Sequence, residues 1–307
     1  MPILGRPWLG VPAKIGWFGI FSLIAIGAAF YLVLGKGTET AATSQLLERD
    51  KIVARAASSN IASFFQVFGD SLAVLSNLDS MERRDGSTVH DLDVFVDQWR
   101  ESDLVGGVVL TDRQGIVRFN SNVLGTHDLG ADLSDRDYFV WARNQAEEGM
   151  YYIGVPVVSR LGATEGETIV PVASPVFQDG AFLGVVATSV RIYPLTSRFL
   201  RFMKFSEETD VYLLDQRGGV LYSNNGKVIS DNIKNRVVVG KEGGFRVDGS
   251  LVSFSPVVLG EQHWSLAVAN PARKVNELAE PVYIRQTAVM LLVFFSFLLF
   301  GMVASRG

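Results

Sequence analysis

The segment around Arg136 carries the side chains best suited to binding a charged small molecule. Ser134 and Asp137 follow the pattern Ser-x-x-Asp, in which a serine caps a helix and an acid three residues later completes the cap. We therefore expect Arg136 and Tyr138 in the first turn of a helix. A guanidinium there can hold a carboxylate through two parallel hydrogen bonds, and free amides at a helix start favour the same anion. The alternative is an ion pair between Arg136 and Asp132, Asp135 or another local acid.

Aromatic and polar side chains near this helix could complete a pocket. Tyr138, Phe139 and Tyr152 are candidate apolar walls, and each is also a candidate for the protein core. Arg160 follows an expected strand and is either a second cation of the site or an arginine of a solvated loop. Ser174 precedes a proline and either contacts the ligand or ends a strand.

Catalytic chemistry has little support in the sequence. His90, His127 and His263 lack metal-ligand spacing, and there is no His-Glu-x-x-His motif or phosphate-binding glycine loop. No serine lies in a nucleophile elbow. The chain has no cysteine, which rules out disulfides and thiolate ligands. We expect no enzyme activity, no cofactor and no metal site in these 307 residues.

Two stretches without charged residues, 15–34 and 287–304, predict membrane-spanning helices. At 1.5 Å of rise per residue, the first matches the roughly 30 Å hydrocarbon core of a bilayer. A cleaved signal peptide is the alternative for the first stretch, but its apolar region would be shorter, about 7 to 15 residues. A buried core helix is the alternative for the second stretch, which is apolar on all sides. A surface helix is not an alternative, because it would need a polar face.

The distribution of charge predicts the orientation of these spans. All 32 Asp and Glu lie between them, with 24 of the 28 Lys and Arg, which leaves this loop at about −8. Both short flanks carry basic residues and no acid, and only short flanks influence topology. We expect a two-pass protein of the inner membrane with cytoplasmic termini and an ectodomain in the periplasm or extracellular space. The acidic loop argues against nucleic acid as a partner.

The loop contains an internal repeat. Residues 108–120 recur 103 positions later as residues 211–223, and both copies centre on Asp-x-x-Gly, a favourable hairpin turn. Residues 174–187 are likewise echoed by residues 255–269, so each copy is expected to end in an antiparallel hairpin. The gap between the two parts is 62 residues in the first copy and 40 in the second. The additional residues in the first copy are where a pocket could form.

Helices are expected on either side of the repeat. Between the first span and the first strand, apolar residues recur at three- and four-residue steps and predict a long amphipathic helix over residues 38–80. Its apolar stripe is either a dimer seam or a face that packs on the sheets. Asn270 and Pro271 are typical of a helix start, and Pro281 is expected to kink that helix. The stripe consists of Val53, Ala57, Ile61, Phe64, Phe68, Leu72 and Leu75.

Four segments, taken together in order, resemble a known family. They are residues 132–139, 152–160, 174–177 and 180–186. The chain resembles the double Cache (PAS-like) extracytoplasmic sensor domains of bacterial chemoreceptors, histidine kinases and diguanylate cyclases, over nearly all of residues 41–283. The resemblance implies an α+β fold with a long N-terminal helix and two tandem PAS-like antiparallel-sheet modules, here flanked by two transmembrane helices. It also implies that the membrane-distal module binds a small ligand and the membrane-proximal module transmits the signal.

The resemblance also bears on the ligand. In the amino-acid-binding branch of the family, the helix carries Arg-x-Trp-Tyr, and a later strand presents an acid to the ammonium group of the ligand. The corresponding residues here are Arg136, Tyr138, Phe139 and Ser189, so three of the four differ. Because the acid is missing, we expect a carboxylate or another small anionic or neutral metabolite rather than an amino acid.

The expected organisation follows from these features. Residues 1–14 form a cytoplasmic N-terminus, 15–35 the first span, 38–80 the long helix, 81–205 the distal module, 206–270 the proximal module, 271–304 the helix leading into the second span, and 305–307 a cytoplasmic stub. Such a chain is either the sensing part of a larger receptor or signals through a membrane subunit in trans. A homodimer is expected. The alternative function is a membrane-anchored adaptor that binds a partner protein and no small ligand.

Overall fold

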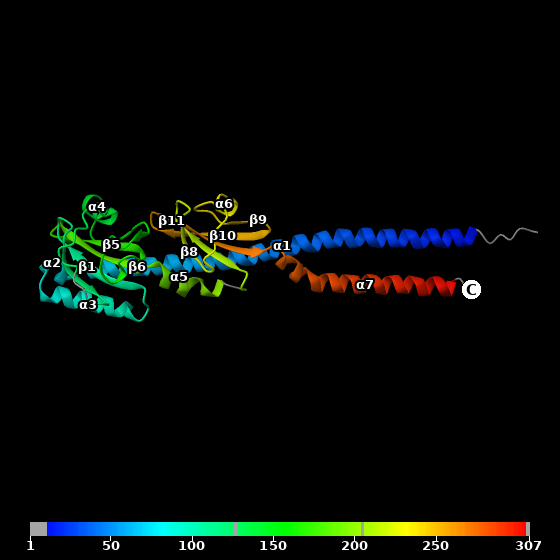
Figure 1. Cartoon of the computed structure of the whole chain (residues 1–307), viewed down its shortest axis with the longest axis horizontal. Coiled ribbons are helices and arrows are strands. Elements are labelled where there is room, and N and C mark those ends of the chain that lie inside the picture. Colours follow the sequence, from blue (N-terminus) through cyan, green and yellow to red (C-terminus); the bar gives the residue numbers. More distant parts are fainter. Residues whose placement is uncertain (1–10, 126–127, 204–205, 305–307) are drawn as a thin grey trace, which may run out of the picture. The chain divides into compact units, whose positions relative to one another are not determined.

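The computed structural model describes residues 11–125, 128–203 and 206–304, in two compact units. One unit combines Met1–Leu47 with Ala272–Gly307, and the other is Glu48–Pro271. The second unit contains both β-sheets, and the candidate ligand-binding site lies in it (Figure 1). The chain is α+β with a long N-terminal helix and two antiparallel sheets, as predicted.

The N-terminal helix α1 is longer than expected, because it runs from Val11–Ser76 without interruption. No proline occurs between residues 12 and 156, so nothing in this stretch removes a helical hydrogen bond. The Oγ of Ser76 donates to the carbonyl of Ala73 at 2.8 Å where the helix ends. The helices α2 (Asp79–Arg83) and α3 (Gly86–Arg100) follow.

The apolar stripe of α1 is a packing face. Ile61, Phe68 and Leu72 are fully buried and belong to a core that includes strands of both sheets. The predicted stripe omitted Phe65, which is also fully buried. Its ring packs edge to face on that of Trp264 in the second sheet, with ring centroids 5.8 Å apart. One helix therefore shares a continuous core with both sheets.

The first sheet has the strand order β2-β1-β6-β5-β3, with β4 also paired to β5. Helix α3 contacts β1 and β2, and helix α4 contacts β5 and β6 (Figure 1). The core on one face includes α1, and a separate apolar cluster on the other face includes α4. The strands are β1 (Val105–Thr111), β2 (Val117–Asn122), β3 (Tyr152–Ile153), β4 (Val157–Val158), β5 (Thr168–Gln178) and β6 (Ala181–Arg191), and α4 is Asp137–Asn144.

The second sheet repeats this order as β8-β7-β11-β10-β9. Strands β10 and β11, the last two along the chain, form a hairpin that corresponds to the β5–β6 hairpin, as the repeat predicted. Short helices connect the two sheets and the strands of the second. The strands are β7 (Asp210–Leu214), β8 (Val220–Ser223), β9 (Gly243–Val247), β10 (Ser250–Leu259) and β11 (Gln262–Pro271), and the helices are α5 (Ile192–Leu200), η2 (Arg201–Met203) and α6 (Asp231–Lys234).

The two Asp-x-x-Gly turns have the same geometry. The carboxylate of Asp112 accepts from the backbone N–H groups of Gln114 and Ile116, each at 2.9 Å. The carboxylate of Asp215 accepts from two backbone N–H groups in the same way, at 2.8 and 2.7 Å. The glycine of each turn, Gly115 or Gly218, has a positive φ. The repeat is therefore structural as well as sequential.

The predicted helix start at Asn270 is wrong. Asn270 and Pro271 end strand β11, and helix α7 is Lys274–Ala304, with Pro281 inside it. The side chain of Asn270 is fully buried, and its amide donates to Asp50 of α1 at 2.6 Å. Its oxygen accepts from Thr209 at 2.8 Å. These tertiary partners replace the helix-capping role.

In the unit formed by the two ends of the chain, α1 and α7 make polar contacts. The Tyr283 hydroxyl donates to the carbonyl of Gly35 at 3.0 Å, and the Gln286 amide donates to Thr38 at 3.2 Å. Among the side chains that the structure describes, no helix offers a run both long and apolar enough to cross a membrane. Many side chains of the two predicted spans lie outside that description, namely 15–21, 23, 24, 26, 28, 30, 32 and 34 in the first and 297, 298 and 300–304 in the second.

Candidate functional site

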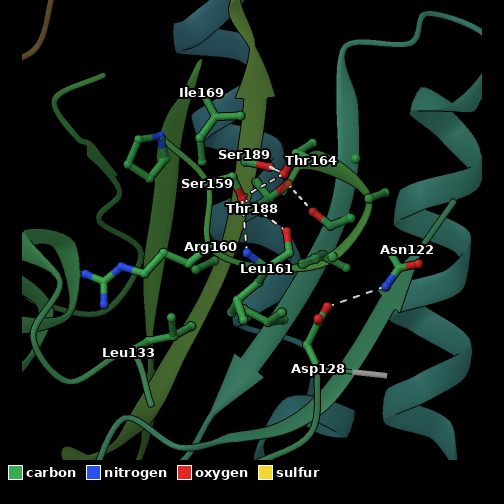
Figure 2. A pocket seen from close by; sticks show the side chains of 18 of the residues that line it. Asn122, Asp128, Leu133, Ser159, Arg160, Leu161, Thr164, Ile169, Thr188 and Ser189 are labelled. Atoms are coloured by element: carbon green, nitrogen blue, oxygen red, sulfur yellow. Dashed lines mark hydrogen bonds between the residues drawn. The ribbon is translucent and has the colours of Figure 1, made fainter. Parts of the chain in front are cut away.

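A cavity of about 80 Å³ lies on the face of the first sheet opposite α1. One water requires roughly 10–15 Å³ by this kind of measure, so the cavity has room for a small metabolite. Strands β1, β2, β5 and β6 form its floor, and the segments before α4 and after β4 form its walls (Figure 2). Its lining includes Gly106, Gly107, Val109, Asn122, Asp128, Leu133, Arg136, Tyr138, Ser159, Arg160, Leu161, Thr164, Ile169, Pro171, Ala187, Thr188 and Ser189.

Residues 159–167 form one wall, and we call this segment the strap. It folds back on itself, because the N–H of Ser159 donates to the carbonyl of Glu167 at 2.9 Å and the N–H of Gly166 donates to the carbonyl of Ser159 at 3.0 Å. It contains the short helix η1 (Gly162–Thr164). A β-carbon on Gly106 of strand β1 would lie only 2.3 Å from the Thr164 methyl group. The absence of a side chain at Gly106 is what lets the strap pack against β1.

Arg136 lines the cavity directly before α4. The predicted cap is wrong, because α4 begins at Asp137, Arg136 is the N-cap residue, and no side chain caps the helix. The N–H of Ser134 instead donates to the Asp132 carboxylate at 2.9 Å. Within the described residues, the Arg136 guanidinium makes no hydrogen bond or ion pair, so the predicted alternative of a local ion pair is not observed. Arg136 is therefore a half-buried cation at the cavity that forms no salt bridge with a described residue.

Arg160 lines the same cavity from the strap, and here the local ion pair is observed. Its guanidinium lies 2.7 Å from the Asp135 carboxylate, and both side chains are more than half exposed. The hydrogen bond from Arg160 lowers the pKa of Asp135 below its usual range. An exposed pair of this kind contributes little stability, but it joins the strap to the segment before α4.

The other predicted aromatic and serine residues divide between cavity and core. Tyr138 lines the cavity, and burial raises the pKa of its hydroxyl. Phe139 does not line it, because this ring is fully buried and packs on Phe182 at 5.9 Å. Tyr152 stacks on Trp141 at 5.2 Å, outside the lining.

Ser174 is also absent from the lining. Its Oγ donates to the Met150 carbonyl at 2.7 Å and lies 2.8 Å from the Oγ of Ser76 at the end of α1. Ser174 therefore faces α1 rather than the cavity. Its role in the structure is to link strand β5 to that helix.

Ser189 lies in the cavity lining, and the structure adds polar residues that sequence reasoning missed. Ser159 and Thr164 of the strap are buried beside it. Asp128 is an acid of the lining, and the Asn122 amide lies 3.5 Å from its carboxylate. No motif or periodic spacing in the sequence indicates that Asp128 and Arg136 line the same cavity. An acid is thus present at this cavity although the position corresponding to the family's acid is a serine.

A metal centre is not apparent. Among the described residues, no three His, Asp or Glu side chains lie together in a way that could hold a metal ion. His127 lies outside the described residues. The cavity lining instead combines hydroxyl groups, two arginines and one acid with apolar side chains, which suits the binding of a small polar organic molecule.

Comparison with known proteins places this fold in a family. The model of the Cache domain family dCache_1 matches residues 38–279. No curated protein sequence matches the chain. The chain therefore belongs to the double Cache family, whose members are extracellular, ligand-binding and non-catalytic sensory modules of membrane receptors.

Solved structures support the fold assignment. The extracellular domain of the putative histidine kinase vpHK1S-Z8 is 15% identical, with a TM-score of 0.60 over 80% of this chain and 96% of that one. The sensory domain of the Campylobacter jejuni chemoreceptor Tlp3 with isoleucine bound is 12% identical, with a TM-score of 0.57 over 78% and 98%. An extracellular ligand binding receptor from Desulfohalobium retbaense is 16% identical, with a TM-score of 0.51 over 76% of this chain and 39% of that one.

Proposed function

We propose that this chain is the extracytoplasmic sensing part of a bacterial transmembrane signalling receptor, and that it binds a small carboxylate-bearing metabolite at the first sheet. The observation that carries the proposal is Arg136, a half-buried cation that forms no salt bridge with a described residue, beside a cavity of about 80 Å³. Removing a cation from water is costly unless it is paired, so this position favours an anionic ligand. The likeness to a chemoreceptor domain with isoleucine bound supports a carboxylate as that anion.

Membrane attachment is part of this proposal. The apolar stretches 15–34 and 287–304 serve as its two spans, with both termini in the cytoplasm. The contacts Tyr283–Gly35 and Gln286–Thr38 lie immediately outside these stretches on both helices. The ends of the two apolar stretches therefore lie level with each other, which supports two helices that enter a lipid bilayer side by side.

Signal transmission is proposed to use the core that α1 shares with the two sheets. A ligand shifts an equilibrium between two packings only by its difference in affinity for them. Asp50 of α1, Asn270 at the end of β11 and Thr209 before β7 are buried and hydrogen-bonded to one another. A shift of the sheets against α1 would act on this network, whose Asn270 lies four residues before α7 begins, and α7 would carry the shift toward the bilayer.

A homodimer is also proposed. The apolar stripe of α1 is occupied by the core, so the contact between copies uses the exposed face of the same helix. That face includes Ile52, Val67 and Val74, which are 55%, 61% and 66% exposed. Contact along α1 would place two copies of the signalling helix together.

Thermal unfolding of the purified chain with a library of small carboxylates tests the sensing proposal. A ligand that binds only the folded state must raise the unfolding temperature. Arg136→Ala should weaken a hit roughly 10- to 150-fold, because a hydrogen bond to a charged group contributes about 1.5–3 kcal/mol. Arg143→Ala is the matched control, since Arg143 lies in α4, the helix that Arg136 precedes, but outside the cavity lining.

Two outcomes would contradict the proposal. One is a carboxylate that stabilises Arg136→Ala and the parent chain equally. The other is the absence of any hit together with a protein that co-purifies with the chain, which would support the adaptor function instead.

A further inference from the structure

Three hydroxyl groups form a chain at one end of the cavity. The Oγ1 of Thr164 lies 3.5 Å from the Oγ of Ser189 on strand β6 and 3.0 Å from the Oγ of Ser159. The Oγ of Ser159 in turn lies 3.1 Å from the carbonyl oxygen of Leu161. Figure 2 shows these groups together, with Asp128 and Asn122 in a separate part of the cavity. Polar recognition at this end therefore depends on neutral oxygen atoms.

The chain has a direction. Each hydroxyl has a single hydrogen to donate. Ser159 donates its hydrogen to the Leu161 carbonyl and accepts from the N–H of Leu161 at 3.4 Å and from Thr164. Thr164 has thus used its hydrogen on Ser159, so Ser189 is the donor in the contact with Thr164. The lone pairs of the Ser189 oxygen remain available, and the cavity presents a hydrogen-bond acceptor at this end.

Packing holds this direction in place. The Thr164 methyl group occupies the space that a β-carbon on Gly106 would need, at 2.3 Å. With the methyl group against β1, the hydroxyl of the same side chain lies toward Ser159 and Ser189. Thr164 and Ser159 are 4% and 8% exposed, so water competes little for these bonds. The acceptor at Ser189 is therefore a built feature of the site.

From this arrangement we infer that the ligand is a small hydroxycarboxylate, with its carboxylate on Arg136 and its hydroxyl donating to the Oγ of Ser189. The inference rests on the proposed function, because it assigns the second polar group of the same ligand. An ammonium would also donate, but a buried ammonium needs an anionic partner, and the three groups at this end are neutral. A hydroxyl requires only the neutral acceptor that Ser189 provides.

Calorimetric titration of the whole chain with matched ligands tests the inference. The probes share a carbon skeleton and differ in one group: 2-hydroxy-3-methylbutanoate, 3-methylbutanoate and valine, with the shorter series 2-hydroxypropanoate, propanoate and alanine. In at least one series, the hydroxy acid should bind roughly 3- to 10-fold more tightly than the deoxy acid, the size expected for one neutral hydrogen bond. It should also bind more tightly than the amino acid.

Variants locate the preference. Ser189→Ala should remove the advantage of the hydroxy acid and leave the affinity for the deoxy acid unchanged. Ser121→Ala, which changes another serine of the lining outside the hydroxyl chain, should keep the advantage. Ser189→Asp should reverse the preference toward the amino acid, because it supplies the anion that an ammonium needs. The comparison of ligands on the parent chain needs no variant and therefore does not depend on variant folding.

The outcomes separate this inference from the proposed function. If hydroxy and deoxy acids bind the parent chain equally and both lose affinity in Arg136→Ala, the hydroxyl assignment is wrong and the carboxylate sensor stands. If the amino acid binds most tightly, the assignment is also wrong. If no probe of either series binds, the inference is overturned, and the carboxylate library decides the proposed function separately.

Discussion

Gly69 of helix α1 offers a test of how closely this helix packs against the first sheet's connections. A β-carbon at Gly69 would lie 2.3 Å from two ring carbons of Tyr151, in the segment between α4 and β3. Carbon atoms pack at about 3.5–4.0 Å, so Gly69→Ala would force the ring back by more than about 1 Å. The ring is partly buried and packs against the core that includes α1, and this burial raises the pKa of its hydroxyl.

Two opposing effects decide the sign of the change in unfolding free energy. Alanine is favoured over glycine in a helix interior by about 0.8–1.0 kcal/mol. Overpacking at a tight contact costs about 1–3 kcal/mol. Gly69→Ala should therefore destabilise the protein by about 1 kcal/mol, which lowers the unfolding temperature by roughly 2–4 °C for a unit of this size.

The double-mutant cycle with Tyr151→Ala isolates the contact. Without the ring, only the helix preference remains, and Gly69→Ala should stabilise the Tyr151→Ala protein by about 1 kcal/mol. Gly86→Ala, at the start of α3 with no atom within 4 Å of its β-carbon, is the control that should cost nothing. Thermal unfolding measures the four proteins of the cycle and the Gly86→Ala control. An equal effect of Gly69→Ala in both backgrounds would refute the proposed packing of α1 against Tyr151.

Two further predictions concern acid stability and assembly. Burial alone would raise the pKa of Asp112, but hydrogen bonds from the Ile116 N–H and the Arg118 guanidinium outweigh it and hold the pKa below 3.8. This carboxylate therefore stabilises the fold above its unfolded pKa of about 3.9 and loses that effect as pH falls through the lower folded pKa. In Asp112→Asn, the urea midpoint of unfolding should therefore fall less steeply with decreasing pH than in the parent chain. An equally steep fall in both proteins would argue against this role of Asp112. Val67→Cys on the exposed face of α1 should form a disulfide between copies under oxidation, whereas Ile61→Cys, in the buried stripe, should not, and the reverse pattern on non-reducing gels would contradict the proposed dimer face.

The sequence predicts the fold well where local chemistry and pairing agree. The turns at Asp112 and Asp215 are recognisable because one carboxylate and one glycine satisfy a tight turn without help from the rest of the chain. The stripe of α1 is recognisable because the apolar residues of a helix that pack on a core recur at three- and four-residue steps. Phe65 is an additional, fully buried ring, next to Phe64, which is only partly buried.

Local patterns fail where distant residues supply better partners. Asn270 followed by proline is a favourable helix start, yet its amide bonds Asp50, which is 220 residues away, and the strand continues. At Ser134 the expected cap is replaced by a turn around Asp132, and α4 begins three residues later. In both cases the side chain that would cap a helix is already committed to another hydrogen bond.

The candidate site shows the same limit through the alternation of strands. Neighbouring side chains of a strand point to opposite faces, so the side chains of Pro171 and Ser174 of β5 are expected on opposite faces of the sheet. The sequence alone predicts that these side chains alternate between the two faces, but it does not indicate which face binds a ligand. The structure decides it, because Ser174 bonds Ser76 of α1, and Pro171 lies in the lining. Ser189 is on the cavity face of β6 with Ala187, and the strap brings Ser159 and Thr164 to it. Polar groups from separate segments meet there only through tertiary folding, which is why the hydroxyl chain could not be found from sequence spacing.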